Sequence, residues 1–217
     1  MELGDDTARI VEQVTYRQDV DRVGDVIITT GEPRDEIDGD LAAVSEIVDA
    51  TWPTSQRHEL AQLSAVREES RGLVGVVHPP ATGGWILSLD LADIDDRALI
   101  EETIVHELSH VVTLDNGVFT FGEVEGCSGV QISLGCAEAD SLLARFADRF
   151  WPCDLGSAFA DDYVNDYAST AAHEDLAETF TAWVLGRPIE GEVIEAKIEM
   201  LSADAEMAEL ADALLLA

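Results

Sequence analysis

The stretch from Thr103 to Leu114 reads TIVHELSHVVTL. On a helix, residues four apart lie on one face, so His106 and His110 would direct two imidazole rings toward one point. Two histidines at this spacing can bind a Zn²⁺ ion. Glu107 would lie close enough to take a proton from a metal-bound water. The stretch therefore predicts a helix that carries chemistry on one face.

The opposite face of this helix is apolar. Its hydrophobic side chains follow the i, i+4, i+7, i+8 spacing of a helix that packs on a core: Ile104, Leu108, Val111 and Val112. We expect the helix to run from about Arg97 to Leu114, with Asp95 or Asp96 as its N-terminal cap. The metal-binding face would then be held in place by a buried face.

The chain is strongly acidic. Its 217 residues include 45 Asp and Glu but 12 Lys and Arg, for a net charge of −33. Such a chain repels nucleic-acid phosphates and anionic membranes, so we expect no nucleic-acid partner. It contains no apolar run long enough to span a membrane, and we expect no membrane insertion. We interpret the charge as a solubilising surface, which a high-salt habitat would also favour.

The three cysteines leave several pairings open. Cys127 and Cys136 could close a small loop, Cys136 could pair with Cys153, or no disulfide forms. A disulfide would indicate an oxidising compartment. No signal peptide is visible. We expect an extracellular or cell-surface protein of a prokaryote, with the cytoplasm of a salt-adapted cell as the alternative, and a monomer.

Hydrophobic spacing and turn residues predict a small, mostly antiparallel sheet before the metal helix. We expect residues 1–34 to be a partly ordered N-terminal segment and residues 35–217 to form one domain. The predicted elements are a strand at Asp25–Thr30, a helix at Asp38–Thr51 that Pro53 ends, and strands at Leu60–Arg67, Leu73–His78 and Trp85–Leu91. The last two would form a hairpin.

The second half of the chain is predicted to be mainly helical, which makes the fold class α+β. The predicted elements are a Gly-rich loop at Val118–Cys136, a helix at Ala137–Phe150, an amphipathic helix within Asp166–Leu185 capped by Ser169 or Thr170, and one or two surface helices over Glu190–Ala217.

A catalytic zinc site needs a third protein ligand and an open position for water. Thr113 and Asn116 stand where the metzincin pattern would place Gly and His, so that pattern fails. The remaining candidates are Asp115, Glu123, Glu125, His173 and Glu174. We favour Glu174, because it lies near the start of an amphipathic helix whose other face is core. Glu178, one turn later, could accept a hydrogen bond from a ligand histidine.

The motif HELSH at 106–110, followed by YASTAAHEDLAE at 167–178, resembles two groups of proteins. These are the gluzincin metallopeptidases of the anthrax lethal factor type and small bacterial zinc-binding metallopeptidases. The resemblance covers about residues 85–185. It implies a zincin-like fold for the domain at 35–217 and one zinc ion per chain.

The resemblance also implies a role for each matching residue. His106, His110 and Glu174 would bind zinc, and Glu178 would support the site. Glu107 would act as the general base, and the hydroxyl of Tyr167 would stabilise the tetrahedral intermediate.

The resulting hypothesis is a zinc metalloendopeptidase that acts on a peptide or protein substrate. We expect the strand at Trp85–Leu91 to be an edge strand that holds the substrate extended, with Trp85, Ser88 and Asp90 as substrate-binding residues. The alternatives are a zinc-stabilised binding or toxin-like module with weak or no hydrolytic activity, and a metal hydrolase that acts on another bond.

A calcium site is a further alternative near the end of the chain. The oxygen-bearing residues there are Asp161, Asp162, Asn165 and Asp166. Their spacing matches no defined calcium loop, so we favour an acidic, solvated loop over a Ca²⁺ site.

Overall fold

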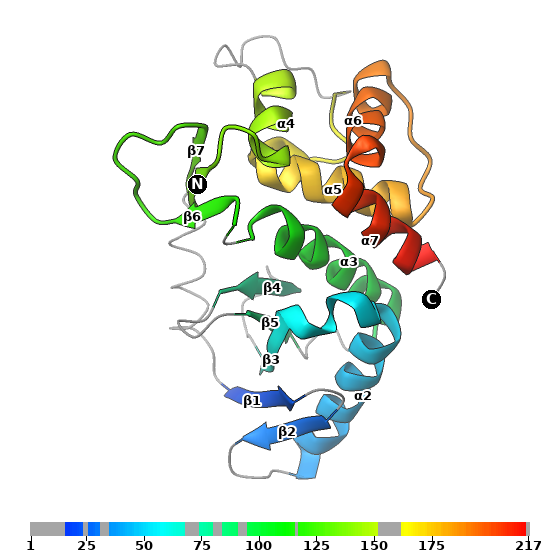
Figure 1. Cartoon of the computed structure of the whole chain (residues 1–217). Helices are drawn as coiled ribbons and strands as arrows, with labels where there is room; N and C mark the ends of the chain where they lie inside the picture. The colour runs from blue at the N-terminus through cyan, green and yellow to red at the C-terminus, as the bar shows by residue number, and fades with distance from the viewer. Residues whose placement is uncertain are drawn as a thin grey trace. The chain divides into compact units, whose positions relative to one another are not determined.

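The computed structural model describes residues 16–23, 26–30, 35–67, 74–79, 84–90, 95–115, 117–151 and 162–215. The chain divides into two compact units, and the boundary between them falls inside helix α3 (Arg97–Thr113), after Leu108. The first unit contains a five-stranded sheet, and the second is mainly helical (Figure 1). The predicted α+β class is therefore confirmed.

The sheet of the first unit is mostly antiparallel, as predicted. Its strands are β1 (Tyr16–Val23), β2 (Val26–Thr30), β3 (Leu60–Arg67), β4 (Gly75–His78) and β5 (Trp85–Asp90). They lie in the order β2-β1-β3-β5-β4, and only the β3–β5 pair is parallel among these described strands. Strand β1 was not predicted, whereas β2, β3 and the β4–β5 hairpin were.

Strand β5 is an interior strand, so the prediction that it forms the edge is wrong. Ser88 pairs with Ser64 of β3 on one side and with Val76 of β4 on the other. The side chains of Trp85, Ser88 and Asp90 are buried, with 2%, 6% and 4% of their surfaces exposed. A parallel partner more than twenty residues earlier in the chain leaves no local signal. Among the described strands, the edges of the sheet are β2 and β4.

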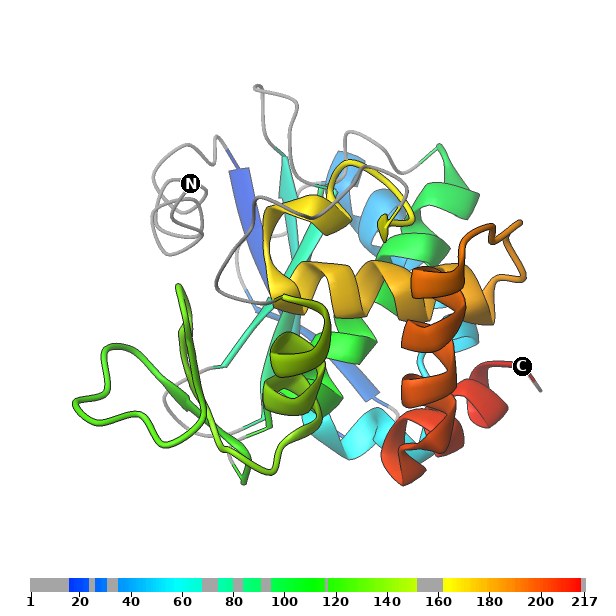
Figure 2. The same ribbon diagram turned by 90° about the horizontal axis from the view of Figure 1, so that it is seen from above.

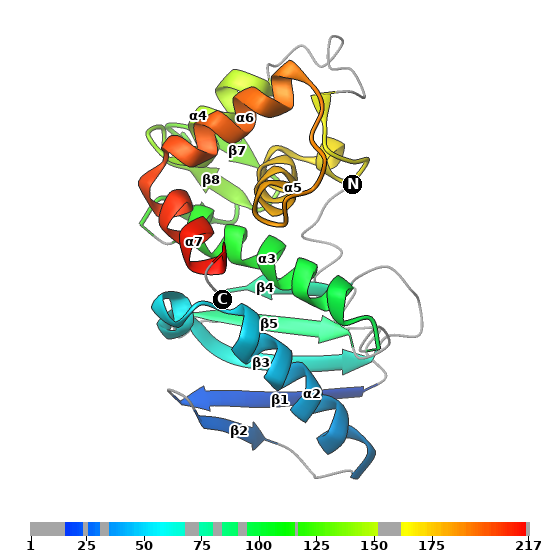
Figure 3. The same ribbon diagram turned by 90° about the vertical axis from the view of Figure 1, so that its right-hand side faces the viewer.

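Helix α2 (Asp35–Thr51) lies across the sheet and contacts β3 (Figure 3). Its described apolar side chains are buried: Val44, Ile47 and Val48. The helix ends before Pro53, as predicted, and the 3₁₀ helix η1 (Thr54–Glu59) leads into β3. Trp52 is 1% exposed and donates from its indole nitrogen to the Gln56 carbonyl, so this connection is anchored in the core.

Helix α3 has the predicted limits and faces. The Asp96 carboxylate accepts a hydrogen bond from the Leu99 amide at 3.1 Å, which caps the first turn. The side chains of Ile104, Leu108 and Val111 are buried. Val112, the fourth residue of the predicted apolar face, is half-buried, and the face that carries His106 and His110 is buried as well. The periodicity of this stretch therefore identified the helix and three of the four side chains predicted for its core face.

The segment predicted as a Gly-rich loop forms a second, three-stranded sheet. Its strands are β6 (Phe119–Phe121), β7 (Val130–Ile132) and β8 (Gly135–Ala137), in the order β6-β8-β7. Strands of three residues are too short to show an alternating pattern. A side chain at Gly135 would place its Cβ 2.1 Å from the Thr120 carbonyl oxygen, so glycine permits the close approach of β6 and β8.

A disulfide joins Cys127 to Cys136 and links the loop before β7 to β8. The first of the three cysteine alternatives is thereby confirmed. Cys153 lies outside the described residues. Closing this short loop restricts the unfolded chain and stabilises the small sheet, which has little apolar surface of its own to bury.

Four helices follow the small sheet: α4 (Leu142–Phe150), α5 (Ala172–Val184), α6 (Glu192–Ala203) and α7 (Ala205–Leu215). Figure 2 shows α5 and α6 crossing each other. None of the helices in the described part of the chain is both long and apolar enough to cross a membrane.

Two predicted helix starts are corrected. Helix α4 begins at Leu142 rather than Ala137, because Ala137 pairs in β8; the Ser141 hydroxyl caps it by accepting from the Ala144 amide at 3.1 Å. Helix α5 is preceded by Ala171, which provides no side-chain cap. The predicted caps Ser169 and Thr170 instead lie in the 3₁₀ helix η5 (Ala168–Thr170).

A buried ion pair joins α5 to α6. Lys197, the only lysine of the chain, is 1% exposed, and its ammonium lies 2.7 Å from the Asp175 carboxylate, which is fully buried. The Trp151 indole also donates to this carboxylate, at 2.9 Å. The ammonium also donates to the Asp162 carbonyl and lies 4.5 Å from the ring centre of Tyr163, with the rings of Phe146 and Phe150 about it at 6.0 and 5.9 Å. Burial raises the pKa of Asp175 above its ordinary value, and Lys197 opposes that rise.

Replacing Lys197 by Met should strongly destabilise the protein. The substitution leaves the Asp175 carboxylate buried without its cation, which typically costs about 3–5 kcal/mol. Urea unfolding followed by circular dichroism measures the change. Arg145→Met is the matched control, because it removes the half-exposed partner of Asp204, a kind of pair worth about 0–1 kcal/mol. Equal losses in the two variants would contradict the importance of the buried pair.

Candidate metal centre

Three buried side chains come together around α3 and α5. His106 and His110 lie one turn apart on α3, and each is 7% exposed. Glu174 lies in the first turn of α5 and is 4% exposed. Isolated charged carboxylates avoid such burial, so Glu174 needs compensating positive charge or hydrogen bonds. The arrangement therefore favours a site that receives a cation.

The spacing of the donor atoms fits a metal ion. One ligand atom from each of His106, His110 and Glu174 lies within 4.8 Å of the others, so this group could hold a metal ion. The Nε2 atom of His110 and the Oε2 atom of Glu174 are 3.4 Å apart. Two donors about 2.1 Å from a tetrahedral zinc ion would themselves be about 3.4 Å apart. Within the described residues, this is the one such group of three.

The predicted third ligand, Glu174, belongs to this group, and the other candidates do not. Asp115, Glu123 and Glu125 have exposed side chains. His173 is buried beside the group but is not one of its three members. Of the residues that the sequence suggested as metal ligands, the fold therefore brings together two imidazoles, from His106 and His110, and one carboxylate, from Glu174.

His173 contacts two members of the group. It is 1% exposed, and its Nε2 atom lies 3.3 Å from Oε1 of Glu174. Its ring centre is 5.7 Å from that of His110, with the two rings tilted by 49°. The sequence had placed His173 among possible metal ligands, but in the structure its Nε2 atom approaches the Glu174 carboxylate. No local sequence pattern distinguishes these two roles.

Glu107 is buried and held by the backbone of the first unit. It is 5% exposed, and its Oε2 atom accepts a hydrogen bond from the Val77 amide at 2.8 Å. Val77 belongs to β4, and its amide faces the free edge of the sheet, away from β5.

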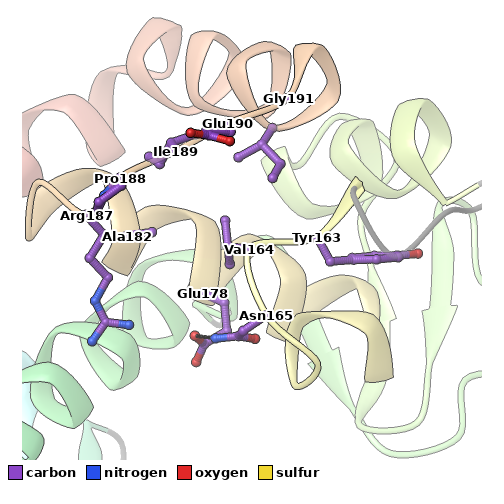
Figure 4. A pocket seen from close by; sticks show the side chains of 11 residues that line it. Tyr163, Val164, Asn165, Glu178, Ala182, Arg187, Pro188, Ile189, Glu190 and Gly191 are labelled. Atoms are coloured by element: carbon purple, nitrogen blue, oxygen red, sulfur yellow. Dashed lines mark hydrogen bonds between the residues drawn. The ribbon is translucent and has the colours of Figure 1, made fainter.

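Glu178 lines a cavity in the second unit. The cavity measures about 540 Å³ and lies between α5, the turn before η5 and the connection from α5 to α6. The Glu178 carboxylate accepts a hydrogen bond from the Asn165 side chain, and Figure 4 shows these two side chains next to each other. Arg187 also lines the cavity. The support of a ligand histidine by Glu178 stays a prediction.

Tyr167 lies in the turn that leads into η5 and has 42% of its surface exposed. Its carbonyl accepts hydrogen bonds from the amide and the hydroxyl of Thr170, at 3.0 and 2.7 Å. This turn fixes the backbone of Tyr167, while the ring remains accessible to a ligand from solvent. The role of its hydroxyl stays a prediction.

The residues considered for calcium have other contacts. The Asn165 side-chain oxygen accepts from the Ala168 amide at 2.8 Å, and the Asp162 carbonyl accepts from Lys197. Asp161 lies outside the described residues. These contacts place Asn165 in the turn before η5 and Asp162 beside Lys197, and a calcium site at this segment stays a disfavoured alternative.

The chain was also compared with known proteins. No protein-family model, no curated protein and no solved structure matches it.

Replacing Glu174 by Ala should remove most of the bound metal. The wild-type protein is expected to hold about one zinc ion per chain, and the variant loses one of three protein ligands. Metal content measured by plasma mass spectrometry tests this. Glu209→Ala, which removes an exposed glutamate from α7, is the control and should keep its metal. Full retention in Glu174→Ala would exclude Glu174 as a ligand.

Proposed function

We propose that this protein is a zinc-dependent metallopeptidase with a zincin-like fold, which hydrolyses peptide bonds in peptides or proteins. One observation supports this most directly: the buried group of His106, His110 and Glu174 lies next to a buried glutamate, Glu107, on the same helix as the two histidines. Two histidines, one carboxylate and a neighbouring base are the parts that metal-assisted hydrolysis requires.

The donor set favours zinc over the hard cations. Two imidazoles and one carboxylate suit Zn²⁺, whereas Ca²⁺ and Mg²⁺ prefer oxygen ligands throughout. When bound, the zinc ion supplies a water of lowered pKa and polarises the carbonyl of the substrate. A structural zinc site is closed by four protein ligands, whereas this group offers three. Within the described residues no fourth ligand joins this group, which favours hydrolysis over a zinc-stabilised module without activity.

Glu107 is the general base in this proposal. Its side chain follows that of His106 on α3, about 100° further around the helix axis, and is long enough to reach a water bound between the two histidines. The Val77 amide holds Oε2, and Oε1 accepts the proton from the attacking water. The protonated carboxyl then donates that proton to the leaving amine, which balances the hydrolysis.

The free edge of β4 is the surface that would hold the peptide. An extended peptide can add to an exposed sheet edge through backbone hydrogen bonds. Strand β4 is paired only with β5 among the described strands, and on its other side the Val77 amide donates to Glu107, so a peptide there would pair with the other backbone groups of the strand. A peptide on that side would run past the Val77 amide and therefore past Glu107. This replaces the role that was predicted for Trp85, Ser88 and Asp90 of β5.

Tyr167 and Glu178 complete the proposed machinery. The hydroxyl of Tyr167 donates a hydrogen bond to the oxygen that becomes negatively charged when water attacks the carbonyl. Glu178 supports the site one turn beyond Glu174. The Cys127–Cys136 disulfide favours an oxidising environment and so an extracellular or cell-surface protein.

Glu107→Gln should abolish peptide cleavage while zinc stays bound. The amide keeps the shape of the side chain but accepts no proton, and loss of a general base typically costs about 10²–10⁴-fold in rate. Casein or a peptide library serves as substrate, with zinc content measured in parallel. Glu101→Gln is the control, because Glu101 lies on the same helix and pairs with Arg97 at the surface. Undiminished cleavage by Glu107→Gln would refute the proposed mechanism.

Tyr167→Phe should lower kcat and leave KM and zinc content nearly unchanged. Removing one donor to a developing oxyanion typically costs about 10²–10³-fold in kcat. Steady-state kinetics on a cleaved peptide separate the two constants. A rise in KM at constant kcat would instead assign Tyr167 to ground-state substrate binding.

A further inference from the structure

We propose that His173 is a positioning residue that keeps Glu174 bound to the metal through a single oxygen. The inference rests on the metal site proposed above and assigns a residue outside its three ligands. It concerns the geometry of the carboxylate, which decides how many positions on the metal remain for water and substrate.

The two oxygens of Glu174 have different partners. Oε2 lies 3.4 Å from Nε2 of His110, as expected when both atoms bind one ion. Oε1 lies 3.3 Å from Nε2 of His173. The carboxylate thus lies between two imidazoles, one for each oxygen. The observed contact is an approach of 3.3 Å; we infer that with metal bound the His173 N–H donates to Oε1, which holds this oxygen away from the metal and leaves Oε2 alone to coordinate it.

Burial makes this division of partners important. Glu174 is 4% exposed and His173 is 1% exposed, so bulk water has little access to Oε1. An oxygen that has neither water nor another donor would gain most by turning to the metal itself. A bidentate carboxylate would then occupy the position that a hydrolytic site keeps open for water. The imidazole of His173 removes this competition.

The position of His173 is fixed from two sides. Its ring packs against that of His110 at a centre-to-centre distance of 5.7 Å. Asp175 lies two residues after His173 in the same turn of α5. It is fully buried and bound to Lys197, so α5 cannot readily rotate about its axis. The ring and the helix therefore hold Nε2 of His173 against the carboxylate of Glu174 before any metal arrives.

Cobalt(II) substitution tests the proposal, because the intensity of the visible bands of Co²⁺ falls as its coordination number rises. His173→Phe keeps a flat ring but removes the donor, and His173→Gln restores a donor. His58→Phe is the matched control: His58 also contacts the next residue, Glu59, at 2.8 Å, but its side chain is 71% exposed. Each protein is loaded with Co²⁺, and a competing chelator measures the affinity.

His173→Phe should bind Co²⁺ about 10-fold more weakly or worse, the usual loss when a partner of a ligand is removed. Its visible absorption should also be weaker, because Glu174 becomes bidentate. His173→Gln and His58→Phe should match the wild type in both measurements. An unchanged spectrum in His173→Phe, or a failure of His173→Gln to restore it, would overturn the proposal in favour of simple packing.

X-ray absorption at the zinc edge tests whether Glu174 binds the metal through one oxygen or two. It uses the wild-type protein, so the result does not depend on the folding of a variant. We expect one short zinc–oxygen distance from a monodentate carboxylate, and a bidentate carboxylate would overturn the inference. Failure of the wild type to bind Co²⁺ or Zn²⁺ would refute both this inference and the proposed function. A wild type that binds metal with the expected spectra but cleaves no peptide would refute the peptidase alone.

Discussion

The ion pair between Lys197 and Asp175 is buried in a chain whose other basic side chains, apart from histidine, are arginines. Taking both charges out of water is costly, and the cost is offset only because each has several partners. The carboxylate receives Lys197 and the Trp151 indole, while the ammonium also lies over the ring of Tyr163. The pair fixes how α5 and α6 are each turned about their own axes, because turning either helix would leave a charge unpaired in the core. It therefore supplies orientation more than stability.

That orientation matters for the neighbouring residue. Glu174 precedes Asp175 in the first turn of α5, so adjacent carboxylates point in directions that differ by about 100° around the helix axis. One carboxylate binds a cation provided by the protein, and the other faces two histidines. Each carboxylate is buried and each has compensating partners. The same helix can thus serve the core and a metal centre without sharing a side chain between them.

The periodicity of the sequence determined much of the framework. It identified the helix α3, the strand β3 with its limits, and the β4–β5 hairpin, since each depends on residues close together in the chain. It did not identify β6, β7 and β8, which are three residues long, or the parallel pairing of β3 with β5. Short strands have no measurable period, and parallel pairing joins segments separated by a crossover. That pairing decided which strand lies at the edge.

The candidate site divides in the same way. By itself, the sequence determined that His106, Glu107 and His110 share one helix, because their spacing needs only the 3.6-residue turn. It also narrowed the third ligand to a few acidic residues and His173. The tertiary structure alone decided that Glu174 approaches the two histidines, that His173 contacts the carboxylate rather than joining the group, and that Val77 holds Glu107. The contacts of Glu174 with His110 and of Val77 with Glu107 join segments at least thirty residues apart. The different positions of His173 and Glu174 depend on the direction in which each side chain leaves the helix. They depend on how the elements pack, which no local pattern of residues contains.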